Sequence, residues 1–247
     1  DAAREAILPL FRSTNLELEN KADQGFDPVT HADKAAERAM RAILEAQRPE
    51  DGILGEEYGE TFGSSGLTWV LDPIDGTRSF MSGTPTWGVL IALRDALGPF
   101  FGLIDQPYIG ERFIGGLGLN TMAGPLGAAA LQTRCTRALK DAVLFSTFPE
   151  IGSRAEHASF QAVAKEVKLV RYGLDCYAYA LLAAGQIDLV IEAVLSAYDV
   201  QAPIAVIEAA GGVVCNWQGR PAHEGGQIIA ATTPELMAAA LPLLQKV

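Results

Sequence analysis

The chain has 247 residues, and 49% of them are hydrophobic, which is enough for one large core or two smaller ones. Its net charge of −11 argues against nucleic acid or an anionic membrane as a partner. We see neither an apolar run near the roughly 18 residues of a membrane span nor a signal-peptide pattern. The three cysteines, at positions 135, 176 and 215, show neither a disulfide framework nor a zinc pattern. Buried free thiols in a cytoplasmic protein are therefore expected.

The first half of the sequence mixes helical and strand patterns. Residues 2–18 have helical spacing, residues 21–28 are polar and predict a loop, and Thr30 and Asp33 precede a second amphipathic helix. Residues 52–66, which are rich in Gly, Glu and Ser, predict an exposed connection. A block of strands follows, at residues 67–71, 86–93, 100–104 and 112–114.

After about residue 135, strand and helix patterns alternate. Strands are expected at residues 143–145, 168–171, 187–191, 212–215 and 227–231, and helices at 153–167, 175–184, 199–210 and 233–245. This alternation is typical of an α/β arrangement with some parallel strand pairing. Because we find neither a repeat nor a linker, we predict a single domain over residues 1–247. It would combine an α+β half, residues 1–134, with an α/β half, residues 135–247.

Residues 69–77, with the sequence WVLDPIDGT, are the most informative part of the chain. Three apolar residues run directly into Asp72 and Asp75, so a buried strand would end with two carboxylates aimed at one point. Carboxylates that close repel each other unless a cation compensates, and hard oxygen ligands select cations such as Mg²⁺. Gly76 permits a tight turn whose following N–H groups can bind an anion. The segment predicts a metal and phosphate site; the alternative is a common turn without chemistry.

Further acidic segments are candidates for the same site, although each has a plainer explanation. Asp27 and Asp33 flank a predicted helix start, where Asp and Thr are frequent N-caps. Glu56 and Glu57 follow a glycine and could form a solvated acidic loop. Asp199 opens an apolar helix and could simply cap it. None of these signals is specific by itself.

Taken together in chain order, the acidic motifs resemble the inositol monophosphatase superfamily of Mg²⁺-dependent, lithium-sensitive phosphatases. The resemblance runs from about residue 20 to the end. One departure is Tyr198, where the family often has Trp before the Asp. The motifs are Asp27-x-x-Thr30-x-x-Asp33, Gly55-Glu56-Glu57, Asp72-Pro73-Ile74-Asp75-Gly76-Thr77, and Tyr198-Asp199 before Glu208-Ala209-Ala210-Gly211-Gly212. The resemblance implies an α/β fold of the layered α+β kind, an alternating α/β/α/β/α sandwich. It also implies a small phosphorylated substrate and a homodimer.

The resemblance further implies a role for each motif residue. Two or three Mg²⁺ ions would be bound. Glu56, Asp72 and the Ile74 carbonyl would hold the first, and Asp72, Asp75 and Asp199 would hold the second. A third, more weakly bound ion would be shared by Glu56 through waters. Backbone N–H groups of Gly76 and Thr77 would hold phosphate oxygens, while Asp33 and Thr77 would orient and deprotonate the attacking water. Glu57 matches a position behind the metal ligands, and Lys21 lies near a mobile-loop lysine of relatives.

Substrate choice is expected to depend on residues outside the metal ligands. Residues 78–83, 87–88 and 171–179 resemble the histidinol-phosphate phosphatase branch. Glu192 matches a glutamate that contacts inositol hydroxyls in relatives, whereas Asp175 stands where inositol-type enzymes usually have a small residue. A carboxylate there suits the cationic part of histidinol, and we expect Arg171 to be a third substrate contact. The alternative is that Asp175 only caps the helix that follows it.

The sequence therefore predicts a Mg²⁺-dependent phosphomonoesterase that hydrolyses L-histidinol phosphate to L-histidinol and phosphate, a step of histidine biosynthesis. An inositol-1-phosphatase or a broad-specificity phosphomonoesterase is the alternative within the same class. A non-catalytic metal-binding relative is the alternative from a different class. The intact pair of Asp33 and Thr77 argues against it, because a scaffold has no need to activate water.

Overall fold

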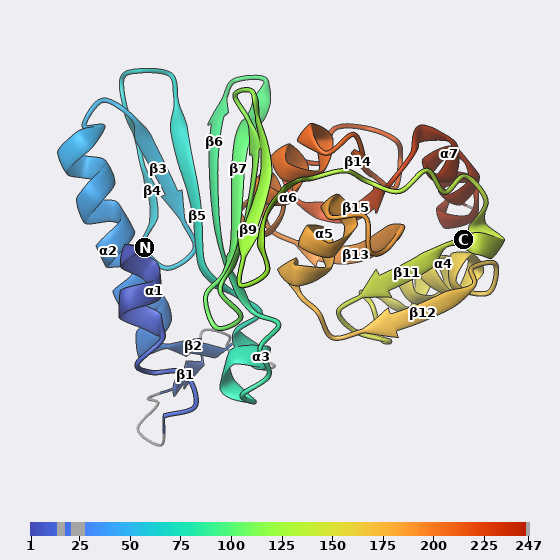
Figure 1. The fold of residues 1–247 in the computed structure, drawn as a ribbon, viewed down its shortest axis with the longest axis horizontal. Helices are drawn as coiled ribbons and strands as arrows, with labels where there is room; N and C mark the ends of the chain where they lie inside the picture. Colours follow the sequence, from blue (N-terminus) through green and yellow to red (C-terminus); the bar gives the residue numbers. More distant parts are fainter. Residues whose placement is uncertain (14–17, 21–27, 246–247) are drawn as a thin grey trace.

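The computed structural model describes residues 1–13, 18–20 and 28–245, which form alternating layers of helices and sheets (Figure 1). Helices α1 (Ala2–Ile7) and α2 (His31–Gln47) cover the outer face of a large sheet. Helices α5 (Cys176–Ala183) and α6 (Ala197–Ala209) lie between the two sheets. Helices α4 (Arg154–Ala164) and α7 (Pro234–Leu244) cover the outer face of the small sheet. The predicted α/β/α/β/α sandwich is confirmed.

The large sheet has eight strands in the order β10-β9-β8-β7-β6-β5-β3-β4. From β5 to β10 it is an antiparallel meander, and only the β3–β5 pair is parallel. A separate antiparallel ribbon is formed by β1 (Leu18–Asn20) and β2 (Pro28–Thr30). The strands of the large sheet are β3 (Gly52–Gly55), β4 (Gly59–Thr61), β5 (Thr68–Asp75), β6 (Gly88–Asp95), β7 (Gly98–Gln106), β8 (Glu111–Gly116), β9 (Leu119–Gly124) and β10 (Gly127–Ala130).

The small sheet has five strands in the order β12-β11-β13-β15-β14. Strand β11 is parallel to both of its neighbours, which confirms the expectation of some parallel pairing, and the other pairs are antiparallel. A short 3₁₀ turn, η1 (Leu139–Asp141), precedes this sheet. Its strands are β11 (Val143–Ser146), β12 (Leu169–Tyr172), β13 (Leu189–Leu195), β14 (Val213–Asn216) and β15 (Gly226–Ala231).

Both sheets bury apolar side chains on both faces. On β5, Val70 points into the core between the sheets, whereas Leu71 packs beneath α1 and α2. On β13, Val190 shares that central core, whereas Leu189 packs towards α4 and α7. Because successive strand residues point to opposite faces and both faces are buried, these strands have nearly continuous apolar sequences. The central core draws residues from both halves of the chain, and we propose a single domain over residues 1–247.

Several sequence predictions need correction. The helix expected over residues 2–18 ends at Ile7, and turns follow to Arg12, because Pro9 lacks the N–H that would continue the helix. Of the predicted loop 21–28, residues 21–27 lie outside the described part, and Pro28 begins β2. The expected connection over residues 52–66 contains β3 and β4, and the glycine- and alanine-rich β9 and β10 were not predicted. Such short strands carry too few large apolar side chains to show a period.

Two further findings concern membrane-spanning helices and the burial of the cysteines. The described part of the chain contains no helix that is long and apolar enough to cross a membrane. All three cysteines are free thiols, but only Cys176 is buried, Cys215 is half-buried, and Cys135 is exposed.

Candidate active site

A β-bulge at the end of β5 aims Asp72 and Asp75 in the same direction. Asp72 pairs with Leu90 and Asp75 with Gly88, so three steps along β5 match two steps along β6. Residues three apart on a regular strand point to opposite faces, and the extra residue of the bulge cancels that inversion. Pro73, which has no N–H to donate, lies within the bulge, where a missing ladder bond is tolerated. The Asp-Pro-x-Asp motif is thus a local device for directing two carboxylates to one point.

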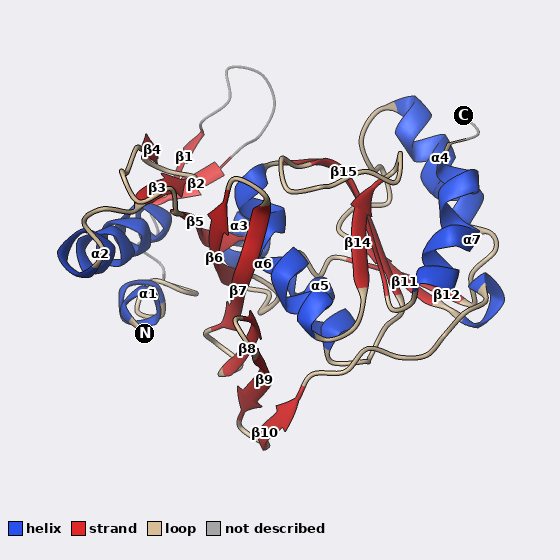
Figure 2. Cartoon of the chain, turned by 90° about the horizontal axis from the view of Figure 1, so that it is seen from above, coloured by secondary structure: helices blue, strands red, loops and turns tan. Residues whose placement is uncertain are grey.

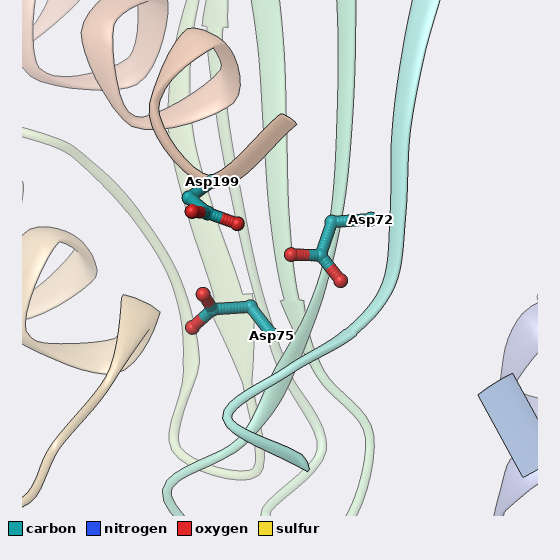
Figure 3. A group of neighbouring side chains, drawn as sticks. All are labelled: Asp72, Asp75 and Asp199. Atoms are coloured by element: carbon teal, nitrogen blue, oxygen red, sulfur yellow. The ribbon is translucent and has the colours of Figure 1, made fainter. Parts of the chain in front are cut away.

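Asp199 reaches the same point from the first turn of α6 (Figure 3). Its Oδ2 accepts a hydrogen bond of 2.7 Å from the Ser196 N–H, so Asp199 does cap the helix. One ligand atom from each of Asp72, Asp75 and Asp199 lies within 4.8 Å of the others. Asp199 caps the helix and also belongs to the converging cluster, so the two explanations of Asp199 are compatible.

The electrostatics of this cluster are unfavourable without a cation. Asp72 is 1% exposed, and its Oδ1 has no hydrogen-bond partner among the described residues. Burial raises the pKa of Asp72 well above its ordinary value, and the charges of Glu56, Asp75 and Asp199 raise it further. Burial and the charges of Asp199 and Asp175 likewise raise the pKa of Asp75, although the Cys176 N–H donates to it at 2.6 Å and opposes the shift. Converging carboxylate oxygens with an unsatisfied buried acceptor fit a hard divalent cation such as Mg²⁺.

Asp33 and Thr77 meet beside the carboxylate cluster. The Thr77 hydroxyl lies 3.3 Å from Asp33 Oδ1 and 3.1 Å from the Ile74 carbonyl oxygen. Asp33 is fully buried, and its Oδ2 accepts from both the N–H and the hydroxyl of Thr30, the N-cap of α2. As with Asp199, one oxygen of Asp33 caps a helix and the other faces the site. The two residues are 44 positions apart in the sequence, and the fold brings them together.

Gly76 allows the chain to turn sharply between Asp75 and the short helix α3 (Thr77–Met81). Its φ of +87° lies in the left-handed region that favours glycine. A β-carbon there would also lie 2.8 Å from Asp175 Cγ, so the side chain of Asp175 packs directly on the turn. Gly76 and Thr77 both line the cavity beside the cluster.

The cavity has a volume of about 540 Å³ and holds both expected acidic substrate contacts. The two carboxylates are Asp175, from the segment before α5, and Glu192, from β13. The other residues that line it include Glu56, Asp75, Arg78, Thr147, Phe148, Tyr179, Tyr198 and Asp199. Arg78 is its only basic residue among those that the structure describes. The acidic cluster and the expected substrate side therefore share one predominantly negative cavity.

Asp175 is held by contacts to the large-sheet half of the molecule. Its Oδ2 accepts from the Ser79 hydroxyl at 2.5 Å and from the Thr86 hydroxyl at 3.3 Å. Burial raises its pKa, and the two hydroxyl groups and the charge of Arg78 oppose that shift. Asp175 precedes α5 with a φ of +47°, and its side chain makes no capping hydrogen bond to the helix. The alternative of a plain capping residue is therefore wrong.

Glu192 lines the same cavity and is buried, with 5% exposure. Its Oε1 accepts from the N–H of Thr147 at 2.6 Å and from its hydroxyl at 2.9 Å, while Ser146 lies 3.3 Å from Oε2. Burial raises the pKa of Glu192 to about 7, and these hydrogen bonds oppose the shift. Ser146 and Thr147 were not predicted. They lie at the end of β11, and the parallel pairing of β11 with β13 places that end near Glu192.

The remaining sequence candidates occupy different positions. Arg171 is exposed on the edge strand β12 and is not among the residues that line the cavity, so its substrate role stays a prediction. Glu57 lies next to the cavity residue Glu56, and its backbone N–H donates to the buried Glu37. Lys21 and Asp27 lie outside the described residues. Tyr179 was expected only as part of the segment 171–179, and its buried hydroxyl has no partner in the described part of the chain. Phe148 was not predicted, and its ring centroid lies 5.1 Å from the Arg78 guanidinium carbon.

Comparison with known proteins identifies the family. The family model described as "Inositol monophosphatase family" matches residues 1–247. The chain belongs to the inositol monophosphatase family. It is therefore a phosphatase of phosphoric monoesters, and members of this family use divalent metals, typically Mg²⁺.

The names of individual relatives differ in the phosphatase activity that they state. The chain is 43% identical over 222 residues to the chloroplastic bifunctional phosphatase IMPL2 of Arabidopsis thaliana, covering 89% of this chain but 62% of that protein. It is 34% identical to the histidinol-phosphatase of Streptomyces coelicolor, covering 94% of this chain and 88% of the relative. Among solved structures, an inositol monophosphatase from Zymomonas mobilis superposes with a TM-score of 0.86 at 39% identity, covering 99% of this chain and 94% of the other.

The carboxylate cluster leads to a prediction for Asp72→Asn. Without Mg²⁺, this variant should unfold at a higher temperature than the wild type, because a buried charge that three neighbouring carboxylates oppose is removed. An increase of about 2–4 °C corresponds to ~1 kcal/mol in a protein of this size. Adding Mg²⁺ should raise the Tm of the wild type much more than that of the variant, and hydrolysis by the variant should fall by several orders of magnitude. Equal stabilisation of both proteins by Mg²⁺ would contradict the cation site.

The raised pKa of Glu192 predicts a pH-dependent effect of Glu192→Gln on stability. The folded-state pKa of about 7 exceeds the ordinary 4.5, so ionisation of Glu192 destabilises the folded protein as pH rises through that interval. The variant should gain stability relative to the wild type between about pH 5 and 7.5, by roughly 2–3 kcal/mol, and the difference should be constant above that. Urea unfolding at several pH values measures it, and a difference independent of pH would show that Glu192 is ionised throughout.

Proposed function

We propose that this protein is a histidinol-phosphate phosphatase that hydrolyses L-histidinol phosphate to L-histidinol and phosphate. The observation that supports this most is the pair of carboxylates, Asp175 and Glu192, on the substrate side of the cavity. They come in addition to the carboxylates that would bind cations. An alcohol that carries an ammonium and an imidazole would compensate their charge, whereas an inositol ring offers only neutral hydroxyls. The similarity to curated histidinol-phosphatases supports the same substrate.

The carboxylate cluster would bind the cations. In this proposal Glu56, Asp72 and the Ile74 carbonyl hold one Mg²⁺, Asp72, Asp75 and Asp199 hold a second, and Glu56 shares a third through waters. Bound cations would neutralise phosphate charge, lower the pKa of bound water and stabilise the leaving oxygen. The bulge of β5 supplies Asp72 and Asp75, and α6 supplies Asp199, so cation binding would join the two halves of the chain.

The chain's own residues would orient the attacking water. If the Thr77 hydroxyl donates its single proton to Asp33, at 3.3 Å, its oxygen lone pairs can accept a hydrogen bond from water. Asp33 is fixed in turn by Thr30, so the pair is held before substrate arrives. Asp33 can then receive the proton of that water through the Thr77 hydroxyl. The backbone N–H groups of Gly76 and Thr77 would hold the phosphate on the other side.

Asp175 and Glu192 would determine which alcohol is accepted. Each has one carboxylate oxygen held by short hydrogen bonds, from Ser79 to Asp175 and from Thr147 to Glu192. Fixed carboxylates lose little side-chain entropy when they bind a cation. Glu57 would support the neighbouring metal ligand Glu56 without being a metal ligand itself. The homodimer, the cytoplasmic location, lithium sensitivity and a role in histidine biosynthesis are further parts of the proposal and rest on the family resemblance.

Two other functions are alternatives to this proposal. An inositol-1-phosphatase or a broad phosphomonoesterase is favoured by the 39% identity to the inositol monophosphatase from Zymomonas mobilis. A non-catalytic metal-binding relative is disfavoured by the contact between Thr77 and Asp33. One assay separates them: phosphate release from histidinol phosphate, inositol 1-phosphate, fructose 1,6-bisphosphate and 3′-phosphoadenosine 5′-phosphate, each with and without Mg²⁺. A preference for inositol 1-phosphate would overturn the substrate proposal, and inactivity on all four would overturn the phosphatase mechanism.

The water-orienting pair predicts a large kinetic effect of Thr77→Ala. Loss of the hydroxyl should lower kcat by about 10²–10⁴-fold, the usual contribution of a general-base element. The Mg²⁺ concentration for half-maximal activity should change little, because the hydroxyl is not a proposed ligand. Thr77→Ser is the matched control, since it keeps the hydroxyl and should retain most of the activity. Recovery of Thr77→Ala at high Mg²⁺ would instead identify Thr77 as a ligand.

The substrate proposal predicts that Asp175→Asn discriminates between two substrates. The amide removes the negative charge but keeps an oxygen that can accept from Ser79 and Thr86. For histidinol phosphate, kcat/KM should fall by the equivalent of about 1.5–3 kcal/mol, the scale of a hydrogen bond to a charged group. For inositol 1-phosphate it should stay the same or rise. Equal losses on both substrates would mean that Asp175 supports the fold or the turn at Gly76.

A further inference from the structure

The metal ligand Glu56 lies in a turn that has little regular structure of its own. Residues 56–58 connect β3 to β4, and β4 is a three-residue exposed strand at the edge of the large sheet. On the sheet side, the Glu56 N–H donates to the Leu71 carbonyl at 3.2 Å. A short turn at an edge would fluctuate unless other contacts held it, and fluctuation of a ligand weakens metal binding.

A buried carboxylate from α2 holds the other side of this turn. Glu37 is 0% exposed. Its Oε2 accepts from the N–H of Glu57 at 2.7 Å, and its Oε1 accepts from the N–H of Tyr58 at 3.2 Å. These are the two residues that directly follow Glu56. The carboxylate therefore fixes the backbone next to the ligand.

Arg41, one helical turn after Glu37, makes this buried charge tolerable. Its Nε lies 2.7 Å from Glu37 Oε1, and its other nitrogens donate to the Gly59 carbonyl and, at 3.2 Å, to the Thr61 hydroxyl. A buried carboxylate without a partner would be strongly unfavourable. The guanidinium thus neutralises Glu37 and binds the far side of the same hairpin. Gly55 completes the contact, since a β-carbon at that position would overlap the Glu37 carboxylate.

The same helix also carries the water-orienting Asp33. Asp33 is in the first turn of α2, and Glu37 follows it by four residues, so both lie on one face of the helix. Asp33 contacts Thr77 directly, and Glu37 reaches the turn of Glu56. One rigid helix can therefore place the water-orienting residue and the metal-binding turn in a constant relation to each other.

We propose that Glu37 is a positioning residue for Glu56, and that its carboxylate, neutralised by Arg41, sets the cation affinity of the site. This inference rests on the proposed role of Glu56 as a metal ligand. Because Glu37 does not touch substrate or cation, its loss should weaken Mg²⁺ binding more than it slows the fully loaded enzyme. A purely structural role would instead lower stability and leave cation affinity unchanged.

The test is the Mg²⁺ dependence of Glu37→Gln. The amide has nearly the same shape as the carboxylate. Both carboxylate oxygens accept hydrogen bonds, so in either orientation the NH₂ group of the amide would face another donor. We expect the Mg²⁺ concentration for half-maximal hydrolysis to rise by about 10–100-fold, the usual effect of losing an outer-shell partner. At saturating Mg²⁺, kcat should recover most of its wild-type value. Tyr58→Phe is the matched control: it removes the hydroxyl contact to Arg38 at 2.6 Å, keeps the Tyr58 N–H, and should leave the Mg²⁺ midpoint unchanged.

A second variant covers the case in which Glu37→Gln does not fold. Gly55→Ala leaves Glu37, Arg41 and Glu56 chemically intact but pushes the carboxylate away from the turn, and it should raise the Mg²⁺ midpoint in the same direction. If whichever of the two variants folds has a wild-type Mg²⁺ midpoint, with or without a lower Tm, the proposal is overturned.

Calorimetric titration with Mg²⁺ separates a failure of this inference from a failure of the proposed function. If Asp72→Asn loses Mg²⁺ binding and Glu37→Gln weakens it, both stand. If Asp72→Asn loses binding but Glu37→Gln keeps wild-type affinity, only the role of Glu37 is wrong. If Asp72→Asn binds Mg²⁺ like the wild type, the cation site itself is misplaced and both proposals fall.

Discussion

The site depends on carboxylates that are held together although they repel one another. Asp72, Asp75 and Asp199 converge from the end of one strand and the start of one helix, and burial and mutual charge raise the pKa values of the two strand residues. Such a cluster persists because the surrounding layers fix its backbone before any cation binds. The stability given up here would be recovered when a divalent metal binds, since a hard cation can satisfy the buried Asp72 oxygen that no described residue contacts.

The layers provide that rigidity by simple means. A bulge turns Asp72 and Asp75 to the same side, and α6, packed between the sheets, presents Asp199 against them. Glu192 comes from a second irregular strand, β13, whose pairing with β15 is also shifted. Regular strands alternate their side chains and cannot direct neighbouring acids to one point, so irregularities occur where the chemistry is. Helix caps serve the same end, because Asp33 and Asp199 each use one oxygen for a cap, while Asp33 also contacts Thr77 and Asp199 also joins the carboxylate cluster.

The negative charge of the cavity also connects the fold to substrate choice. Cations at the cluster would balance the proposed metal ligands, but Asp175 and Glu192 are further carboxylates that line the same cavity. Ser79 and Thr86 hold the first of these, and Thr147 and Ser146 hold the second. None of these hydroxyl-bearing partners carries a charge, which leaves both carboxylates able to attract a cationic alcohol. In the proposed function, the hydrolysis site and the substrate-selecting carboxylates thus share one cavity.

The sequence by itself determined most of the longer helices and strands and the acidic motifs, because these depend on periodicity and on local residue order. The layered fold was expected only from the family resemblance of those motifs. Helical spacing alone did not show that α1 ends at Ile7, before Pro9, that residues 52–61 contain two short strands, or that Arg171 lies on an exposed edge. Only the tertiary structure brought Thr147 to Glu192, Ser79 to Asp175 and Glu37 to the turn of Glu56. These pairs are separated by 20 to 96 residues. Contacts between distant segments follow from how layers pack, and a single sequence carries no local pattern for them.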